Sequence, residues 1–277
     1  MNLIGLDDFI INALKEDLGT GDITTDCCVP ADARSKGSFR AKEDGIVCGI
    51  DVLKRVFYIV DPSIKIDVLI GDGAPVKKGE IIAEIEGTSR SVLSGERLAL
   101  NLIQHMSGIA TAAHKASLLV AGTKARIADT RKTTPGMRII EKYAVKTGGG
   151  SNHRFNLSDG VLIKDNHIVA AGGITQAVEA ARANIPHTIK IEVETETMEQ
   201  VKEAVEAKAD IIMLDNMTNE QMKEAVDFIA GRALTEASGN MGERDLTAVA
   251  QTGVDIISIG ALTHTVKALD ISLKFHD

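Results

Sequence analysis

Polar and charged side chains follow every apolar run in the second half of the chain. They occur at six consecutive places: Asp129 to Lys132, Lys164 to His167, Glu192 with Glu194, Asp215-Asn216, Ser238-Gly239 and Gly260. One polar residue after a strand usually caps the next helix or forms a turn. Lys and Glu are poor caps, however, and the pattern repeats six times. We therefore predict that these residues line one site.

Five candidate residues carry or can gain a positive charge: Arg131, Lys132, His153, Arg154 and Lys164. A guanidinium offers paired donors that suit carboxylates and phosphates, and an ammonium adds a compact charge. Residues 94–172 include 11 Lys and Arg against 5 Asp and Glu, whereas the rest of the chain has 20 against 34. Cations concentrated in one segment of an acidic protein suggest a small polyanionic ligand. The charge counts alone leave a solvated basic helix face as an equal alternative.

Carboxylates and glycines follow the later strands. Glu194 and Asp215 offer oxygens for sugar hydroxyls or for a metal ion. Glu192 and Glu194 are two residues apart, so on a strand they face the same side, and a buried acidic pair needs partners. Gly-containing loops at 237–240 and 258–261 favour phosphate, because backbone N–H groups and a helix N-terminus can approach it there. Together these residues describe a cavity with a cationic side, an acidic middle and a phosphate end.

The composition is ordinary for a globular chain. Its 277 residues are 44% hydrophobic and 25% charged, enough for one large domain or two smaller ones. The net charge of −8 argues against a nucleic-acid partner. Cys27, Cys28 and Cys48 form neither a disulfide framework nor a zinc motif. The acidic N-terminus does not resemble a signal peptide, and no uncharged apolar run reaches the roughly 18–20 residues of a membrane span. We expect a cytoplasmic protein without a membrane partner.

Two patterns of secondary structure divide the chain. Up to about residue 100, helices at 6–19 and 51–60 are mixed with short extended runs, at 38–42, 45–49, 64–70 and 80–87. This mixture predicts an α+β domain with an antiparallel sheet. A long helical stretch over 89–119 is expected to bridge two domains.

From about residue 124, strands and helices alternate. The predicted strands are at 125–129, 160–164, 188–194, 210–215, 232–237 and 255–260, and the last four begin about 22 residues apart. Near-continuous apolar strands indicate burial on both faces, as in parallel sheets. The segment is too short for eight strand–helix units, so we predict a shortened or incomplete α/β barrel. Residues 268–277 are expected to return to the first domain as a strand.

The residues at the predicted strand ends resemble those of a known family. Seven motifs carry the resemblance: DTRKTTPGMR (129–138), KYAVKTGGGSNHR (142–154), LIKDNHI (162–168), IEVE (191–194), MLDN (213–216), EASGN (236–240) and ISIGALTH (257–264). In this order and spacing they are similar to the quinolinate phosphoribosyltransferases. The similarity extends over essentially the whole chain, including SGERLALNLIQHMSGIAT (94–111), and the combination of the first three motifs is highly specific.

The resemblance implies a fold, a reaction and an assembly. The fold is an N-terminal α/β sandwich domain over 1–107, joined by the tail 270–277, and an open seven-stranded α/β barrel over 108–269. The reaction joins quinolinate and phosphoribosyl pyrophosphate to give nicotinate mononucleotide, pyrophosphate and carbon dioxide in de novo NAD synthesis. Mg²⁺ is expected to enter with the substrate pyrophosphate, without a direct protein ligand. A homodimer, or a higher oligomer, is implied in which Arg97 of one subunit completes the site of the other.

The resemblance also implies a role for each site residue. Arg97, Arg131, His153, Arg154 and Lys164 would surround the quinolinate carboxylates, and Lys132 and Lys164 would also reach the phosphoribosyl pyrophosphate side. Thr130 is expected among the substrate-binding residues. Glu194 and Asp215 would engage the ribose hydroxyls, while Ser238, Gly239, Asn240 and Gly260 would hold the 5′-phosphate. Lys132, Lys164, Glu194 and Asp215 are the expected catalytic residues. The chain departs from many members at Asn240-Met241-Gly242, which changes the phosphate loop but retains its backbone donors.

Three alternatives stay open. The chain could be a related barrel enzyme for another substrate, such as the protein encoded with molybdate-transport genes. It could be an aldolase-type barrel that forms a Schiff base through Lys164 or Lys190. It could also be an anion-binding protein without catalysis. The dense match among the basic residues favours the phosphoribosyltransferase over all three.

Overall fold

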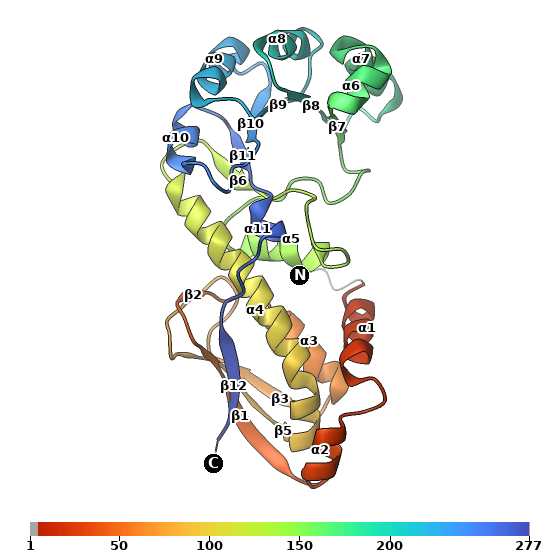
Figure 1. The fold of residues 1–277 in the computed structure, drawn as a ribbon, viewed down its shortest axis with the longest axis vertical. Coiled ribbons are helices and arrows are strands. Elements are labelled where there is room, and N and C mark those ends of the chain that lie inside the picture. The colour runs from red at the N-terminus through yellow and green to blue at the C-terminus, as the bar shows by residue number, and fades with distance from the viewer. Residues whose placement is uncertain (1–4, 277) are drawn as a thin grey trace. The chain divides into compact units, whose positions relative to one another are not determined.

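The computed structural model describes residues 5–276, in two compact units (Figure 1). Among the described residues, one unit comprises 5–114, 135–149 and 266–276, and the other comprises 115–134 and 150–265. The helix predicted over 89–119 is observed as α4 (Ser89–Leu119). No helix in the described part of the chain is long and apolar enough to cross a membrane.

The first unit is built on an antiparallel sheet. Its strands follow the order β12 (Ile271–Phe275), β1 (Arg34–Ala41), β5 (Ile81–Thr88) and β3 (Lys65–Val68), while β2 (Gly45–Ile46) pairs with β4 (Pro75–Val76). Its other helices are α1 (Leu6–Leu18), α2 (Ile23–Cys28), α3 (Ile50–Val60) and α5 (Arg138–Thr147). Phe39 of β1 and Phe57 of α3 are fully buried and meet edge to face, with ring centroids 6.1 Å apart. The predicted antiparallel sheet and the returning C-terminal strand are both confirmed.

The second unit is built on a parallel, barrel-like sheet. Its strands follow the order β6 (Arg126–Ala128), β11 (Ile256–Ser258), β10 (Leu234–Ser238), β9 (Ile211–Asp215), β8 (Ile191–Thr195) and β7 (Val161–Ile163). Each strand lies within or beside a run predicted from the sequence. The alternation of strands and helices therefore places the elements correctly.

Six strands are present where the resemblance implied seven. A single parallel bridge between Ala128 and Ser151 occupies the place of the seventh strand. Beyond that bridge the ladder is replaced by side-chain bonds: the Asn152 side chain and the His153 backbone N–H both donate to the Asp129 carboxylate, at 2.6 and 2.9 Å. Asp129 thus takes hydrogen bonds that a longer strand would have used for the sheet. No ladder among the described residues joins β7 to Ser151, so the barrel is open there.

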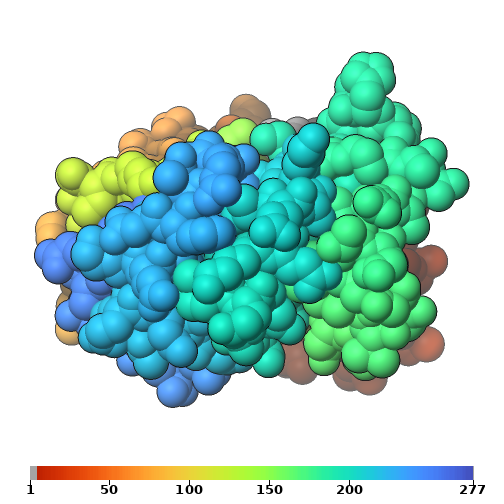
Figure 2. All heavy atoms as spheres, turned by 90° about the horizontal axis from the view of Figure 1, so that it is seen from above, coloured from red at the N-terminus to blue at the C-terminus, as the bar shows by residue number. Residues whose placement is uncertain are grey.

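Helices cover the outer face of this sheet. They are α6 (Asp165–Ala171), α7 (Ile174–Asn184), α8 (Met198–Glu206), α9 (Asn219–Ile229) and α10 (Leu246–Gln251). The short α11 (Ala261–His264) lies instead at the end of β11, where Thr263 contacts Lys132. Figure 2 shows the segments between β7 and β11 side by side, from green to blue, in an outer layer. Ile191 and Val193 of β8 are fully buried. Since side chains alternate along a strand, Glu192 and Glu194 point to the opposite, inner face.

Candidate active site

Strand-end residues gather on the inner face of the barrel. Asp215 is the register partner of Ser238, and Glu194 is the register partner of Met213. Register partners point to the same side of a sheet, so these side chains line one rim at the carboxyl ends of the strands. The prediction that polar strand ends converge is confirmed for β8, β9 and β10.

Other residues cap the helices that follow. Thr197 caps α8 and Thr218 caps α9, each accepting the backbone N–H of a Gln three residues on, and Asp245 caps α10. At α6, the backbone N–H of Lys164 donates to His167 Nδ1 at 3.0 Å. Because the caps are supplied separately, Glu194 and Asp215 do not serve as helix caps.

Lys164 and Glu194 form an ion pair at the rim. Lys164 Nζ lies 2.5 Å from Glu194 Oε2, and the two side chains are 46% and 14% exposed. This pair argues against Lys164 as a Schiff-base nucleophile, which must be neutral to attack.

Asp215 and the loop after β10 are joined through Asn216. The Asn216 side chain donates to Asp215 Oδ2 at 2.6 Å, and its backbone N–H donates to the Ser238 carbonyl at 3.1 Å. Asn216 and Asn240 both adopt a positive φ, 55° and 50°. Asn216 belongs to the strand-end residues predicted to line the site, and the structure adds its link between Asp215 and Ser238, which the sequence did not predict.

Lys132 lies against the loop after β11. Its backbone N–H donates to Thr130 Oγ1 at 3.0 Å, and its carbonyl accepts from the buried Thr263 hydroxyl at 2.9 Å. A Cβ on Gly260 would lie 3.0 Å from Lys132 Cδ, so glycine leaves room for the lysine side chain. The first and last strands of the barrel are thereby linked at the rim.

The guanidinium groups of Arg131 and Arg154 lie close enough to repel each other, and neighbouring groups balance their positive charge only in part. Arg131 Nε is buried and has no hydrogen-bond partner among the described residues. Burial, followed by repulsion from Arg131, lowers the pKa of Arg154 below its ordinary value. Arg154 Nη1 donates to the Gly160 carbonyl at 3.0 Å. This basic pair has the character of a site for an anion.

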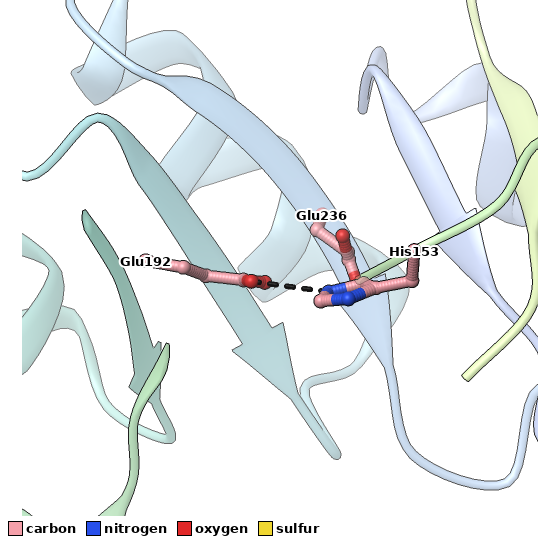
Figure 3. A group of neighbouring side chains, drawn as sticks. All are labelled: His153, Glu192 and Glu236. Carbon is pink, nitrogen blue, oxygen red and sulfur yellow. Dashed lines mark ion pairs between the residues drawn. The ribbon is translucent and has the colours of Figure 1, made fainter. Parts of the chain in front are cut away.

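Below the rim, His153 faces two buried glutamates (Figure 3). Its Nε2 lies 3.1 Å from Glu192 Oε2 and 3.7 Å from Glu236 Oε1. Burial, together with the charge of Glu192, raises the pKa of Glu236 to about 7. The predicted need of Glu192 and Glu194 for partners is confirmed, since each is paired. Glu236 lies within the EASGN motif but was missed, because its proximity to His153 and Glu192 arises only in the folded barrel.

A cavity of about 390 Å³ adjoins this cluster. His153, Arg154, Glu192 and Glu236 line its polar wall, and Ile211 and Ile256 contribute apolar surface. A wider cleft of about 760 Å³ also lies at the amino ends of the strands, with ion pairs such as Lys124–Asp255 at its edge, and Lys190 lines both hollows. Barrel enzymes carry their chemistry at the carboxyl ends, so the candidate site is the rim at those ends, with His153 and Arg154 reaching down to the smaller cavity.

The predicted site residues are not all in one unit. Thr130, Arg131, Lys132, His153, Arg154, Lys164, Glu194, Asp215, Ser238, Gly239, Asn240 and Gly260 belong to the barrel unit. Arg97 is exposed on α4 in the first unit. Among the described residues, His153, Glu192 and Glu236 form a group whose side chains are of types that bind metals. One possible ligand atom from each lies within 4.8 Å of the others.

Sequence comparison matches two domain families along the chain. Residues 22–107 match the N-terminal domain of quinolinate phosphoribosyl transferase, and residues 109–274 match its C-terminal domain. A Bacillus subtilis (strain 168) protein named "Probable nicotinate-nucleotide pyrophosphorylase (carboxylating)" is 44% identical over 273 residues, which cover 99% of this chain and 94% of that protein. A Nicotiana glauca protein named quinolinate phosphoribosyltransferase (decarboxylating) 2, mitochondrial, is 45% identical, with coverage of 95% and 80%.

Comparison with solved structures agrees. The nicotinate-nucleotide pyrophosphorylase of Francisella tularensis superposes with a TM-score of 0.95 at 40% identity, covering 100% of this chain and 98% of that one. The Pyrococcus furiosus enzyme of the same name superposes with a TM-score of 0.73 at only 15% identity, over 99% and 76% of the two chains. The second likeness shows a shared fold.

Proposed function

The chain belongs to the quinolinate phosphoribosyltransferase family, and we propose that its reaction takes place at the rim of the barrel described above. The enzyme transfers the phosphoribosyl group of phosphoribosyl pyrophosphate to quinolinate, with loss of carbon dioxide. The product is nicotinate mononucleotide, the precursor formed in de novo NAD synthesis.

The phosphoribosyl group lies along β9 to β11 in this proposal. Ser238, Gly239, Asn240 and Gly260 surround the 5′-phosphate with backbone N–H groups, which suit an anion. Asp215 and Glu194 accept hydrogen bonds from the ribose hydroxyls. The Asn216 bonds, which tie Asp215 to the loop after β10, support a shared ribose and phosphate subsite.

Quinolinate is bound on the basic side of the rim. Arg131, Arg154 and Lys164 bring positive charge to its two carboxylates, and His153 belongs to the same wall. Thr130 and Lys132, beside Gly260, lie toward the phosphoribosyl pyrophosphate. Two guanidiniums that repel each other in the free enzyme gain compensation when a dianion binds between them.

The chemistry follows from where charge develops. Departure of pyrophosphate leaves positive charge on the ribosyl ring, which the carboxylates of Glu194 and Asp215 stabilise electrostatically. The quinolinate nitrogen, held against that carbon, supplies the electron pair of the new bond. The resulting pyridinium nitrogen is the electron sink for loss of the adjacent carboxylate, so no organic cofactor is needed.

Mg²⁺ is proposed as the metal of the reaction. It prefers oxygen ligands and is commonly bound through substrate phosphates and one or two carboxylates. We expect it to enter with the substrate pyrophosphate, without a direct protein ligand. When bound, Mg²⁺ neutralises the negative charge of the leaving pyrophosphate.

Arg97 is proposed to act in a homodimer, where it would complete the site of the partner subunit. Its exposure on α4 leaves its guanidinium accessible to a partner. Dimerisation and a cytoplasmic location stay predictions.

One observation carries the assignment of the site: the partly uncompensated Arg131 and Arg154 lie in the same unit as the Lys164–Glu194 pair and the Asn216 loop. The test is to incubate the pure protein with quinolinate, phosphoribosyl pyrophosphate and Mg²⁺ and to follow nicotinate mononucleotide by chromatography. Arg131→Ala and Lys164→Met should remove the product, and nicotinate should not replace quinolinate. Full turnover by either variant would refute the site.

A further inference from the structure

The His153 ring links two buried carboxylates to Arg154. Its Nδ1 accepts the backbone N–H of Arg154 at 2.8 Å, and its Nε2 lies 3.1 Å from Glu192 Oε2. A ring nitrogen that accepts a hydrogen bond carries no proton. The proton of the neutral ring is therefore on Nε2, from which it is donated to Glu192. The imidazole is held as one tautomer by contacts on both sides.

This tautomer distinguishes the cluster from a metal site. Histidine and two glutamates are suitable ligand types for a divalent cation. A metal at Nε2 would need the lone pair of that nitrogen, and the proton would then move to Nδ1. Two hydrogens would face each other between Nδ1 and the Arg154 N–H. The contacts therefore favour hydrogen bonding over metal binding.

We propose that Glu192 and Glu236 are positioning residues for quinolinate binding: they hold the neutral His153 ring, which fixes the backbone of Arg154 and so aims its guanidinium. This inference rests on the proposed function. Burial and Arg131 disfavour the charge of Arg154, whereas Glu192 and Asp159 favour it, so Glu192 supports Arg154 both directly and through His153. The visible anchors of Arg154 are the Nδ1 contact at its backbone and the Gly160 carbonyl at its guanidinium.

The charge of the cluster makes the arrangement pH-dependent. Glu236 is 1% exposed, and it is faced by Glu192 from β8, by His153, by Asp129 after β6 and by the Ser258 hydroxyl of β11. Its pKa of about 7 keeps it largely neutral below pH 7, so the pair carries a single negative charge. Above pH 7 a second charge forms beside Glu192. The second carboxylate repels Glu192 at the same ring nitrogen, which weakens the hold of the pair on His153.

Steady-state kinetics of three variants test the proposal. Glu192→Leu removes the acceptor of the Nε2–H, so the quinolinate KM should rise about tenfold or more at pH 7, while the phosphoribosyl pyrophosphate KM stays within about twofold. Glu192→Gln should recover most of that loss, because its amide oxygen can accept the same bond. Glu203→Gln is the matched control. This half-buried carboxylate on α8 accepts from Thr175 instead, and its loss should move neither KM.

The pH profile tests the role of Glu236. Glutamine resembles the protonated acid and cannot ionise, so the rise of the wild-type quinolinate KM above pH 7 should be absent from Glu236→Gln. Nitrogen-15 NMR of the His153 ring should show a protonated Nε2 and a bare Nδ1 in both proteins at pH 6.5. The wild-type spectrum by itself tests the predicted tautomer, so this test does not depend on how any variant folds.

Three results would overturn the inference: equal increases of both KM values in Glu192→Leu, a wild-type pH profile in Glu236→Gln, or a protonated Nδ1 at pH 6.5. Failure of the wild-type enzyme to form nicotinate mononucleotide would instead refute the proposed function.

Discussion

Gly239 couples the phosphate loop to Asp215 through a close contact with Asn216. A Cβ at position 239 would lie 2.2 Å from Asn216 Oδ1 and 2.7 Å from the Asn216 backbone nitrogen. That nitrogen donates to the Ser238 carbonyl, so it cannot move away without losing a hydrogen bond. Gly239 also has a φ of 92°, a region that disfavours L side chains. Gly239→Ala is therefore expected to displace Asn216, and Asp215 with it.

The expected cost has two parts. A side chain in the left-handed region costs about 1–2 kcal/mol, and an overpacked contact adds roughly 1–3 kcal/mol. We expect the free energy of unfolding to fall by about 2–5 kcal/mol. The phosphoribosyl pyrophosphate KM should rise about tenfold or more, because a displacement worth roughly 1.4 kcal/mol in binding has that effect. The quinolinate KM should change little.

A Gly231→Ala variant separates the cost of the left-handed conformation from the cost of the close contact. Gly231 lies just before β10, the strand that Gly239 follows. It has a φ of 76°, and a Cβ there would lie in open space. The control should lose only about 1–2 kcal/mol of stability and retain both KM values. Stability is measured by circular dichroism in urea, since the chain has no Trp to report by fluorescence. Equal phosphoribosyl pyrophosphate KM values for the two variants would refute the coupling of Gly239 to the ribose subsite.

Four further predictions concern the charged groups. Arg131→Ala should lose activity by about 100-fold or more with little change in melting temperature, because its buried Nε makes no hydrogen bond; a large loss of stability would contradict this. Removal of Mg²⁺ by EDTA should stop product formation, and added Mg²⁺ should restore it; full turnover in EDTA would argue against the metal. Arg97→Ala mixed with Glu194→Gln should regain part of the activity if sites are shared; confirmed mixed dimers without recovery would count against sharing. The pKa of Glu236 is raised from its ordinary 4.5 to about 7, so its contribution to stability is complete below pH 4.5 and is lost as pH rises through 7. Urea unfolding of Glu236→Gln should lack that part of the pH dependence, and parallel curves would disprove the assignment.

Local patterns account for most of the architecture. The sequence predicts the long helix over 89–119 and the six strand–helix units because the spacing of their apolar residues follows helical or extended geometry. The motifs at the strand ends identify the family for the same reason, since they are continuous segments. The apolar runs predicted the six strands observed, and only the family resemblance implied a seventh. Asp129 replaces that strand's ladder with hydrogen bonds to Asn152 and His153, and their partnership depends on the folded chain.

The sequence predicted in part which residues line the candidate site. Polar residues after each strand, and the alternation of Glu192 and Glu194, predicted an inner wall rich in charge. The sequence did not predict how far each carboxylate lies from the rim of the barrel. Glu194 pairs with Lys164 at the rim, while Glu192 faces His153 in the interior. Register between strands decides this depth, and it depends on contacts between segments distant along the chain.

The amino-acid sequence alone therefore determined the family, the order of the elements and the positions of the site residues along them, because all three depend on residue type and local spacing. Only the tertiary structure decided that Glu236 lies beside Glu192, that the Arg154 backbone N–H donates to His153 Nδ1 and that Asn216 lies against Gly239. These contacts exist only once parallel strands have aligned around a common interior, where burial makes each choice of partner and each proton energetically significant.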